Sequence, residues 1–356
     1  MFNSIKEDRS CDILIIGGGL AGLLPAREIA GSEKDIIIAE KRSIGSGRTA
    51  VGKDVVFTDG GLSLETREDV NIKEIAEEFA ALTDELESIC EEVGEKSFKR
   101  RGLFIFSDRS KERADIRRRF SIERLSNRNA DFLTSDIISA DFSFDFDSGV
   151  YTEQGGATVN AKALAEKMAS YLSLNGIFIA ENTEIKSLVP SSKGFTAKTE
   201  GQISIFTKEV IDTRCFFEKR AVLSAKTAPT ESDLGWPQEC IIRDTYKNRM
   251  TFYRTSDKKI GMTYEKPIIL PQIIGSGHKF EYMQQILSSM FFAIPNTMLT
   301  EKDMIFEEKA SVSKTGILRS PEFESLYMFK HPYANGILSA IKGAKSFGSI
   351  ADNGRK

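Results

Sequence analysis

Three glycines and one acidic residue are spaced as they are in sites that bind a dinucleotide. Gly17, Gly19 and Gly22 form the pattern G-x-G-x-x-G directly after an apolar run, residues 13–16, and Glu40 ends a second apolar run. The first glycine permits a tight turn, the second lets backbone approach a pyrophosphate, and the third lets a helix pack on a strand. The N-terminus of that helix offers free N–H groups and a partial positive charge to phosphates. The pattern therefore predicts a strand, glycine turn, helix and second strand around a dinucleotide.

The position of Glu40 narrows the choice of dinucleotide. It lies eighteen residues after Gly22, where an acid accepts hydrogen bonds from the ribose hydroxyls. A carboxylate there argues against a 2′-phosphate, so the sequence favours FAD or NAD over NADP. Pro25 falls inside the expected helix, where its ring would clash with the carbonyl of Ala21, and it predicts a kink or a late helix start.

Composition and charge argue against several other classes of protein. The chain has 356 residues, which suggests two domains, and its formal net charge of −3 gives no basic surface for nucleic acid. The four cysteines have no C-x-x-C spacing and there are two histidines, so we expect neither a metal site nor a disulfide framework. The first ten residues are polar and no run of about 20 apolar residues occurs, so we expect no integral membrane segment and a cytoplasmic location.

Hydrophobic periodicity predicts the helices. Residues 70–94 predict an acidic helix, and residues 111–129 a very basic one, whose arginines 117–119 we interpret as a solvated face. A third helix follows a cap at Thr158 or Asn160. The chain closes with a strand, residues 326–329, and a helix that begins near Gly336.

A series of short apolar segments follows the third helix. These strand-like segments are residues 177–180, 184–189, 194–199, 203–211 and 220–225. We interpret them as a strand and a β-meander that returns to a buried strand, residues 220–225, beside a Rossmann sheet.

Three separated blocks of sequence resemble the FAD-dependent amine oxidase superfamily, which contains monoamine oxidases, renalase, phytoene desaturases and protoporphyrinogen oxidase. The first block runs from GGGLAG through Glu40 to IGSGRTA and FTDGG. The second is QGGATVNAKALAEKMASYL with the meander after it, and the third is ESLYMFKHPYANGILSAIKGAKSFGSIAD. The resemblance implies an α/β fold: a Rossmann-type FAD-binding domain, with a central parallel sheet and β-meander, plus an α+β substrate domain. The FAD-binding domain would comprise residues 1–65, 155–228 and 312–356, and the substrate domain residues 66–154 and 229–311.

The resemblance also implies roles for individual residues. The glycine loop and Arg48 would hold the FAD pyrophosphate, and Glu40 the ribose. Gly60 and Gly61 would let backbone come close to the isoalloxazine, Ile185 would meet the adenine through its main chain, and the last helix would direct its positive end at the flavin. The cofactor-binding residues implied for a non-covalent FAD are Gly17, Gly19, Leu20, Ala21, Gly22, Glu40, Lys41, Gly47, Arg48, Gly60, Gly61, Ile185, Ala225, Gly336 and Ile337.

Two stretches depart from the family pattern. The family usually has a glycine and an acid after the last strand, where this chain has Phe329-Lys330-His331-Pro332, and its G-G-R segment is here Gly45-Ser46-Gly47-Arg48. The substrate half offers only candidates chosen by region for catalytic residues: Lys266, Tyr264 and His331.

We therefore expect an FAD-dependent oxidoreductase that accepts a hydride from a small organic substrate, which would be an amine, a reduced nicotinamide or a desaturation substrate. A D-amino-acid-oxidase-type amino-acid or amine dehydrogenase is an alternative, because its FAD motif and first strands have the same pattern. A flavin-binding protein with little or no catalysis is another, because the acid after Phe329 is missing.

Overall fold

The computed structural model describes most of the chain. The described residues are 2–52, 54–61, 72–126, 128–135, 142–214, 220–232, 235–244, 249–268, 277–294, 297–307, 316–330 and 336–353. The helices are α1 (Leu20–Glu28), α2 (Arg48–Val51), α3 (Ile72–Val93), η1 (Ser110–Glu112), α4 (Arg113–Leu125), α6 (Ala161–Leu174), η2 (Pro237–Glu239), α7 (Gly277–Met290) and α8 (Gly336–Asn353).

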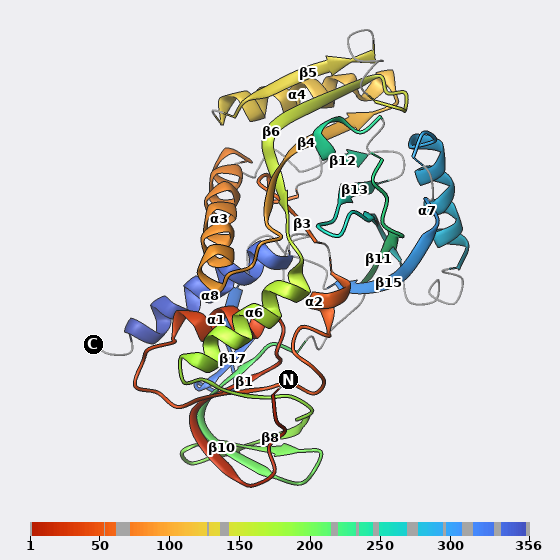
Figure 1. Ribbon diagram of the computed structural model, residues 1–356. Helices are drawn as coiled ribbons and strands as arrows, with labels where there is room; N and C mark the ends of the chain where they lie inside the picture. Colours follow the sequence, from red (N-terminus) through yellow and green to blue (C-terminus); the bar gives the residue numbers. More distant parts are fainter. Residues whose placement is uncertain are drawn as a thin grey trace.

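The strands form two sheets (Figure 1). Those of the first sheet are β1 (Arg9–Ile16), β2 (Ile36–Ala39), β7 (Phe178–Ala180), β8 (Ile185–Ser191), β9 (Gly194–Thr199), β10 (Ser204–Asp212), β16 (Gly316–Arg319) and β17 (Leu326–Lys330). Those of the second sheet are β3 (Val55–Phe57), β4 (Lys99–Ser107), β5 (Ala130–Thr134), β6 (Ser148–Thr158), β11 (Arg220–Thr227), β12 (Ile241–Asp244), β13 (Met250–Arg254), β14 (Ile260–Ile268) and β15 (Leu299–Glu307).

The first sheet is parallel at its centre. Its order is β16-β17-β10-β1-β2-β7, and β1 runs parallel to both β2 and β10. Helices α1, α3, α6 and α8 contribute to the apolar cluster on one face, while β8 and β9 contribute to the cluster on the other. Because both faces are covered, β1 and β2 have continuous apolar runs instead of alternating ones. The predicted Rossmann-type sheet with a β-meander is confirmed.

Residues 220–225 form the predicted strand, as part of β11, but the predicted place of that strand beside the Rossmann sheet is wrong. Strand β10 is both the last strand of the meander and the parallel neighbour of β1, so the meander returns to the first sheet one strand earlier than predicted. Strand β11 instead pairs antiparallel with β14 and β15, so Ala225 lies in the second sheet. A short buried apolar run has no periodicity that assigns it to one sheet or another.

The second sheet has one apolar and one partly polar face. On the apolar face, residues such as Ala225, Phe252 and Met262 pack against α7 and Trp236. The opposite face is turned to the segment between α2 and α3, because Lys226 and Arg243 reach Asp54 and Gly61 from it. Figure 1 shows β6 running from the upper part of the molecule down to α6, which covers the first sheet.

Asp54 ties the two sheets together. One carboxylate oxygen accepts the amide N–H of Ala161 at the start of α6 (3.1 Å), and the other lies 2.5 Å from Nζ of Lys226 on β11. Burial lowers the pKa of Lys226, but the Asp54 charge and hydrogen bond outweigh it and the pKa is raised. The ammonium therefore stays charged between the sheets.

Helix α1 contains Pro25 in its interior. The helix begins at Leu20, directly after the glycine turn, so the late start that we considered from the sequence is wrong. Among the helices that the structure describes, none combines the length and the apolar character that crossing a membrane requires.

We expect the cap of α6 to contribute measurably to stability. The side chain of Asn160 accepts the N–H of Ala163 at 2.9 Å, so Asn160→Ala should lower the free energy of unfolding by about 1 kcal/mol in urea denaturation. Ser170→Ala is the control, because its exposed hydroxyl bonds only to the Glu166 carbonyl of the same helix. Equal losses in both variants would contradict the capping role.

Candidate functional site

The glycine turn leaves no room for side chains. Gly17 has a φ of +113°, and a Cβ there would lie 2.4 Å from Oγ1 of Thr213. A Cβ on Gly22 would lie 2.1 Å from the carbonyl oxygen of Gly17, which is the close packing of helix on strand that the pattern predicts. Gly18 is equally constrained, because its Cβ would meet Ile44 at 2.4 Å. The G-x-G-x-x-G spacing allows any residue at this position, so the constraint on Gly18 could not be predicted from it.

Glu40 is held in place by the glycine turn itself. Its carboxylate accepts the amide N–H of Gly18 at 2.7 Å and that of Arg42 at 2.8 Å, while its own N–H donates to Ala180. A carboxylate has about four lone-pair positions, so two remain for ribose hydroxyls. The predicted ribose acid is thus oriented by the protein alone, and its contact with a ribose stays a prediction.

The N-terminus of α1 and the start of α2 lie together. The hydroxyl of Thr49 accepts the N–H of Leu20 at 3.2 Å, which places its neighbour Arg48 beside the helix end. Nη1 of Arg48 is buried and has no hydrogen-bond partner among the described residues. A buried guanidinium nitrogen without an acceptor beside a helix N-terminus suits a phosphate oxygen. These residues therefore fit the FAD pyrophosphate, and Thr49 is a further part of this site that the sequence reading missed.

The other predicted cofactor contacts differ in their surroundings. No described atom lies within 4 Å of a Cβ built on Gly47 or Gly336, so both border open space, while Ile337 is buried in the core of the first sheet. Lys41 is exposed and Ala21 half-buried. The carbonyl of Ile185 already accepts from Nη1 of Arg214 at 3.0 Å. Their contacts with FAD remain predictions.

Two of these residues pack against other elements of the protein. Ala225 packs in the cluster under α7 in the second sheet, and its contact with the cofactor stays a prediction. Gly60 has a φ of +71°, and a Cβ there would meet Ile75 at 3.1 Å and Phe79 at 3.2 Å. Its Cα therefore packs against α3, and Gly61, also at +71°, completes the turn.

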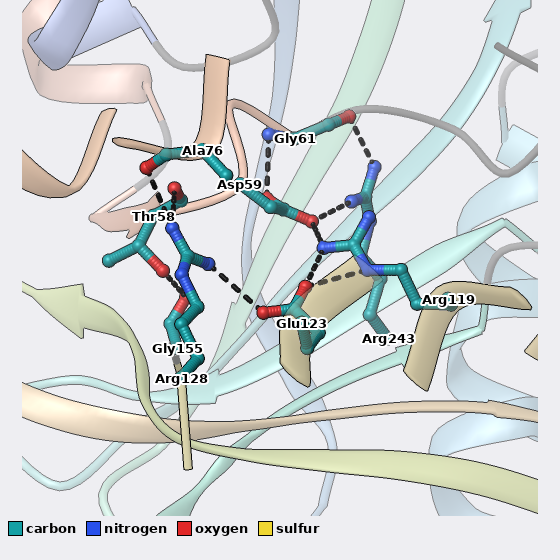
Figure 2. Close-up of polar contacts among 9 residues, drawn as sticks. All are labelled: Thr58, Asp59, Gly61, Ala76, Arg119, Glu123, Arg128, Gly155 and Arg243. Atoms are coloured by element: carbon teal, nitrogen blue, oxygen red, sulfur yellow. Dashed lines mark hydrogen bonds and ion pairs between the residues drawn. The ribbon is translucent and has the colours of Figure 1, made fainter. Parts of the chain in front are cut away.

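A buried network of charges surrounds this turn (Figure 2). Arg119 pairs with Asp59 and, at 2.6 Å, with Glu123, and these three side chains are 2–3 % exposed. Arg128 pairs with Glu123 at 3.2 Å, and Arg243 lies 3.9 Å from Asp59. The sequence predicted a solvated basic face for arginines 117–119, which is wrong for Arg119. Glu123 lies four positions further along the same helix, but helical position could not show that Asp59, sixty positions away, would also meet Arg119.

The charges in this network stabilise one another. Burial raises the pKa of the Asp59 carboxyl, but Arg119 and Arg243 outweigh it and the pKa is lowered. Burial lowers the pKa of Arg119, and the Asp59 and Glu123 charges raise it above its ordinary value. Both groups therefore remain ionised inside the protein.

A row of polar side chains crosses the face of the second sheet that is turned to the segment 54–61. Strand register places Arg243 beside Thr251, Thr251 beside Thr263, and Thr263 beside Ser224. All four are at most 3 % exposed, and the hydroxyl of Thr263 has no hydrogen-bond partner among the described residues. The sequence reading did not select any of these residues, because the register that aligns them is not visible in the chain.

Of the three catalytic candidates from the sequence, only Tyr264 has a side chain among the described residues. Tyr264 lies on the opposite face, where its ring centroid is 6.4 Å from that of Tyr282 on α7. Lys266 belongs to β14, but its side chain lies outside the described residues, as does His331 altogether. Tyr264 thus lies on the face opposite to the polar row, and its catalytic role stays a prediction.

Arg48 should matter for FAD binding more than for folding. We expect Arg48→Met to raise the FAD dissociation constant about tenfold to hundredfold, because a hydrogen bond to a charged group contributes about 1.5–3 kcal/mol. Flavin fluorescence titration of the apoprotein measures this. Arg42→Met is the matched control, since that exposed side chain makes only a 3.4 Å contact with the Ser46 carbonyl. An unchanged dissociation constant for Arg48→Met would exclude the phosphate contact.

Asp59 should make the protein less stable in acid. Because its pKa is lowered in the fold, its contribution is present above the unfolded value of about 3.9 and is lost as the pH falls through the folded value. Asp59→Asn should destabilise the protein at pH 7 and flatten the decline of unfolding free energy below about pH 4. Asp115→Asn, on the exposed side of α4, should keep the wild-type slope. Equal slopes for Asp59→Asn and wild type would contradict this.

Known proteins resemble this chain in sequence and in fold. The Gamma-glutamylputrescine oxidoreductase of Escherichia coli (strain K12) is 20 % identical over 208 residues, which are 57 % of this chain and 49 % of that protein, so the match spans about half the relative. Glycine oxidase from Geobacillus kaustophilus superposes with a TM-score of 0.77 at 15 % identity, over 97 % of this chain and 95 % of that one. The L-alpha-Glycerophosphate Oxidase of Mycoplasma pneumoniae, with FAD bound, gives a TM-score of 0.78 at 12 % identity over 97 % and 95 %.

A family model decides between the two flavoprotein groups considered from the sequence. The model described as "FAD dependent oxidoreductase", DAO, matches residues 12–214, more than half of the chain. The predicted FAD-dependent oxidoreductase is thus confirmed, whereas the narrower assignment to the amine oxidase superfamily is not supported. The glycine motif and first strands have the same pattern in both groups of flavoproteins, so they do not distinguish the DAO family from the amine oxidase superfamily. The chain belongs to the DAO family of FAD-dependent oxidoreductases, and FAD is its cofactor.

Proposed function

We propose that this protein oxidises a small amino acid or amine at its C–N bond. The observation that carries the proposal is the row of Arg243, Thr251, Thr263 and Ser224 on the face of the second sheet turned to the segment 54–61. Hydroxyl and guanidinium groups suit a small substrate with polar or charged groups. They do not suit the long apolar chain of a desaturation substrate, because buried polar groups must find partners. The hydroxyl of Thr263, with no described partner, is the strongest single indication.

The relatives favour the same class of substrate. Glycine oxidase and Gamma-glutamylputrescine oxidoreductase are both named for nitrogen compounds. The likeness to L-alpha-Glycerophosphate Oxidase keeps a polyol phosphate as the second candidate, since the same hydroxyl row and Arg243 would also suit a phosphate ester.

In this mechanism the protein binds the cofactor, orients the substrate and excludes water. When bound, FAD supplies the hydride acceptor, and an external oxidant restores it. Gly17–Gly22, Arg48 and Glu40 would hold the pyrophosphate and ribose, and α8 would direct its positive end at the flavin. The polar row would orient the substrate, whose C–N bond becomes an imine as it loses a hydride and a proton. The near-complete burial of the row keeps water from the reacting atoms.

Anaerobic reduction of the purified full-length chain tests the proposal. The protein should be yellow, and glycine, proline, other amino acids or small amines should bleach its absorbance near about 450 nm, where flavins absorb. The same panel includes glycerol 3-phosphate, NADH and NADPH. Bleaching by glycerol 3-phosphate alone would replace the proposal with the second candidate. Bleaching by NADH or NADPH alone, or by nothing in the panel, would reject it.

A further inference from the structure

We infer that the buried charges around Asp59 form a positioning device, which fixes the turn Thr58–Gly61 against the flavin from the side of the second sheet. The inference rests on the proposed function, because it assumes a bound flavin between the two sheets. The residues concerned are Asp59, Arg119, Glu123, Arg128 and Arg243 (Figure 2).

The network holds the backbone of the turn at both ends. Nη2 of Arg128 donates to the carbonyl of Thr58 at 2.5 Å, and Nη2 of Arg243 donates to the carbonyl of Gly61 at 2.9 Å. The carboxylate of Asp59 accepts the amide N–H of Gly61 at 2.8 Å. The turn therefore has its path set by charged side chains, in addition to the ladder contact of Thr58 with Gly155.

The charged side chains come from the second sheet and its helix. Arg119 and Glu123 lie on α4, Arg128 follows that helix, and Arg243 lies on β12. Arg128 also donates to the carbonyl of Ala76 at 2.7 Å, so one guanidinium spans the turn and the start of α3. Side chains from three separate segments thus converge on four residues of backbone.

The turn also packs against α3, which in turn contacts α8. Gly60 packs against Ile75 and Phe79 of α3, and Phe79 shares an apolar cluster with Leu338 and Ile341 of α8. Glu78 of α3 pairs with Lys342 of α8 at 2.5 Å. We expect the N-terminus of α8 to point at the flavin. A displacement of the turn would therefore change the surroundings of the flavin directly and also through α3 and α8.

Energetics favour a role in geometry over one in stability. Taking these charges out of water is costly, and well-packed apolar side chains of similar volume generally stabilise a fold as well or better. What apolar side chains cannot do is fix the direction of two carbonyls and one amide. The guanidinium of Arg119 bonds to Asp59 and Glu123 through two nitrogens. That of Arg128 bonds to Glu123 through Nη1 and to two carbonyls through Nη2, which sets angles as well as distances.

Replacement of an arginine by lysine tests the inference, because charge is kept and the fork is lost. Arg119→Lys should weaken FAD binding about tenfold, measured by flavin fluorescence titration. It should also shift the flavin absorption bands and the midpoint potential of the bound FAD. Arg118→Lys on the exposed face of the same helix is the matched control and should change none of these. Arg128→Lys, whose side chain is 11 % exposed, repeats the test if Arg119→Lys does not fold.

The outcomes separate the inference from the proposed function. If Arg119→Lys and Arg128→Lys lower only the melting temperature, and leave FAD affinity, spectrum and potential as in wild type, the network serves folding and the inference is overturned alone. If the wild-type chain itself fails to bind FAD, the proposed function fails and the inference falls with it. Matching spectral changes in both variants, absent from Arg118→Lys, would support the positioning role.

Discussion

The cofactor half of this protein depends on the close packing of Gly22 against the carbonyl of Gly17. A single methyl group at Gly22 would come within 2.1 Å of that oxygen. Because α1 rests directly on the turn after β1, the helix N-terminus is aimed at the carboxyl end of the first sheet, where ligands of open α/β sheets bind. Glu40 and Thr49 are then ordered by backbone amides of the same turn and helix. The cofactor site thus follows from one packing restriction.

The interior combines this tight backbone packing with buried charge. The Asp54–Lys226 pair and the Asp59 network both connect the segment between α2 and α3 with the second sheet. Ionised groups in such places are stable only with partners, as the raised pKa of Lys226 and the lowered pKa of Asp59 reflect. The segment around β3 is therefore joined to β11, β12 and α4 by contacts of defined direction as well as by apolar surface.

Local patterns predicted the parts of the fold that are local in sequence. The unit from β1 to Glu40 and the helix beginning at Gly336 needed only a glycine spacing, apolar runs and a stop signal. The sheet to which β11 belongs is decided by its pairing with β14 and β15. Its partners lie between 35 positions (Lys226–Gly261) and 87 positions (Arg220–Glu307) further along the chain. Arg119 looked solvated because its acid Asp59 lies sixty positions away. Tyr264 and Thr263 alternate on one strand, and only the packing of α7 shows which face each occupies.

The parallel pairing of β1 with β10 carries a consequence for biosynthesis. Arg9 stands beside Ile205, and β10 in turn pairs with β17, which begins at Leu326. Although the nucleotide fingerprint is complete within the first forty residues, the sheet that supports it gains its neighbours only when most of the chain has left the ribosome. Contacts of such long sequence separation form slowly. A nascent chain would therefore carry the fingerprint for much of translation before it has a surface on which the cofactor can settle.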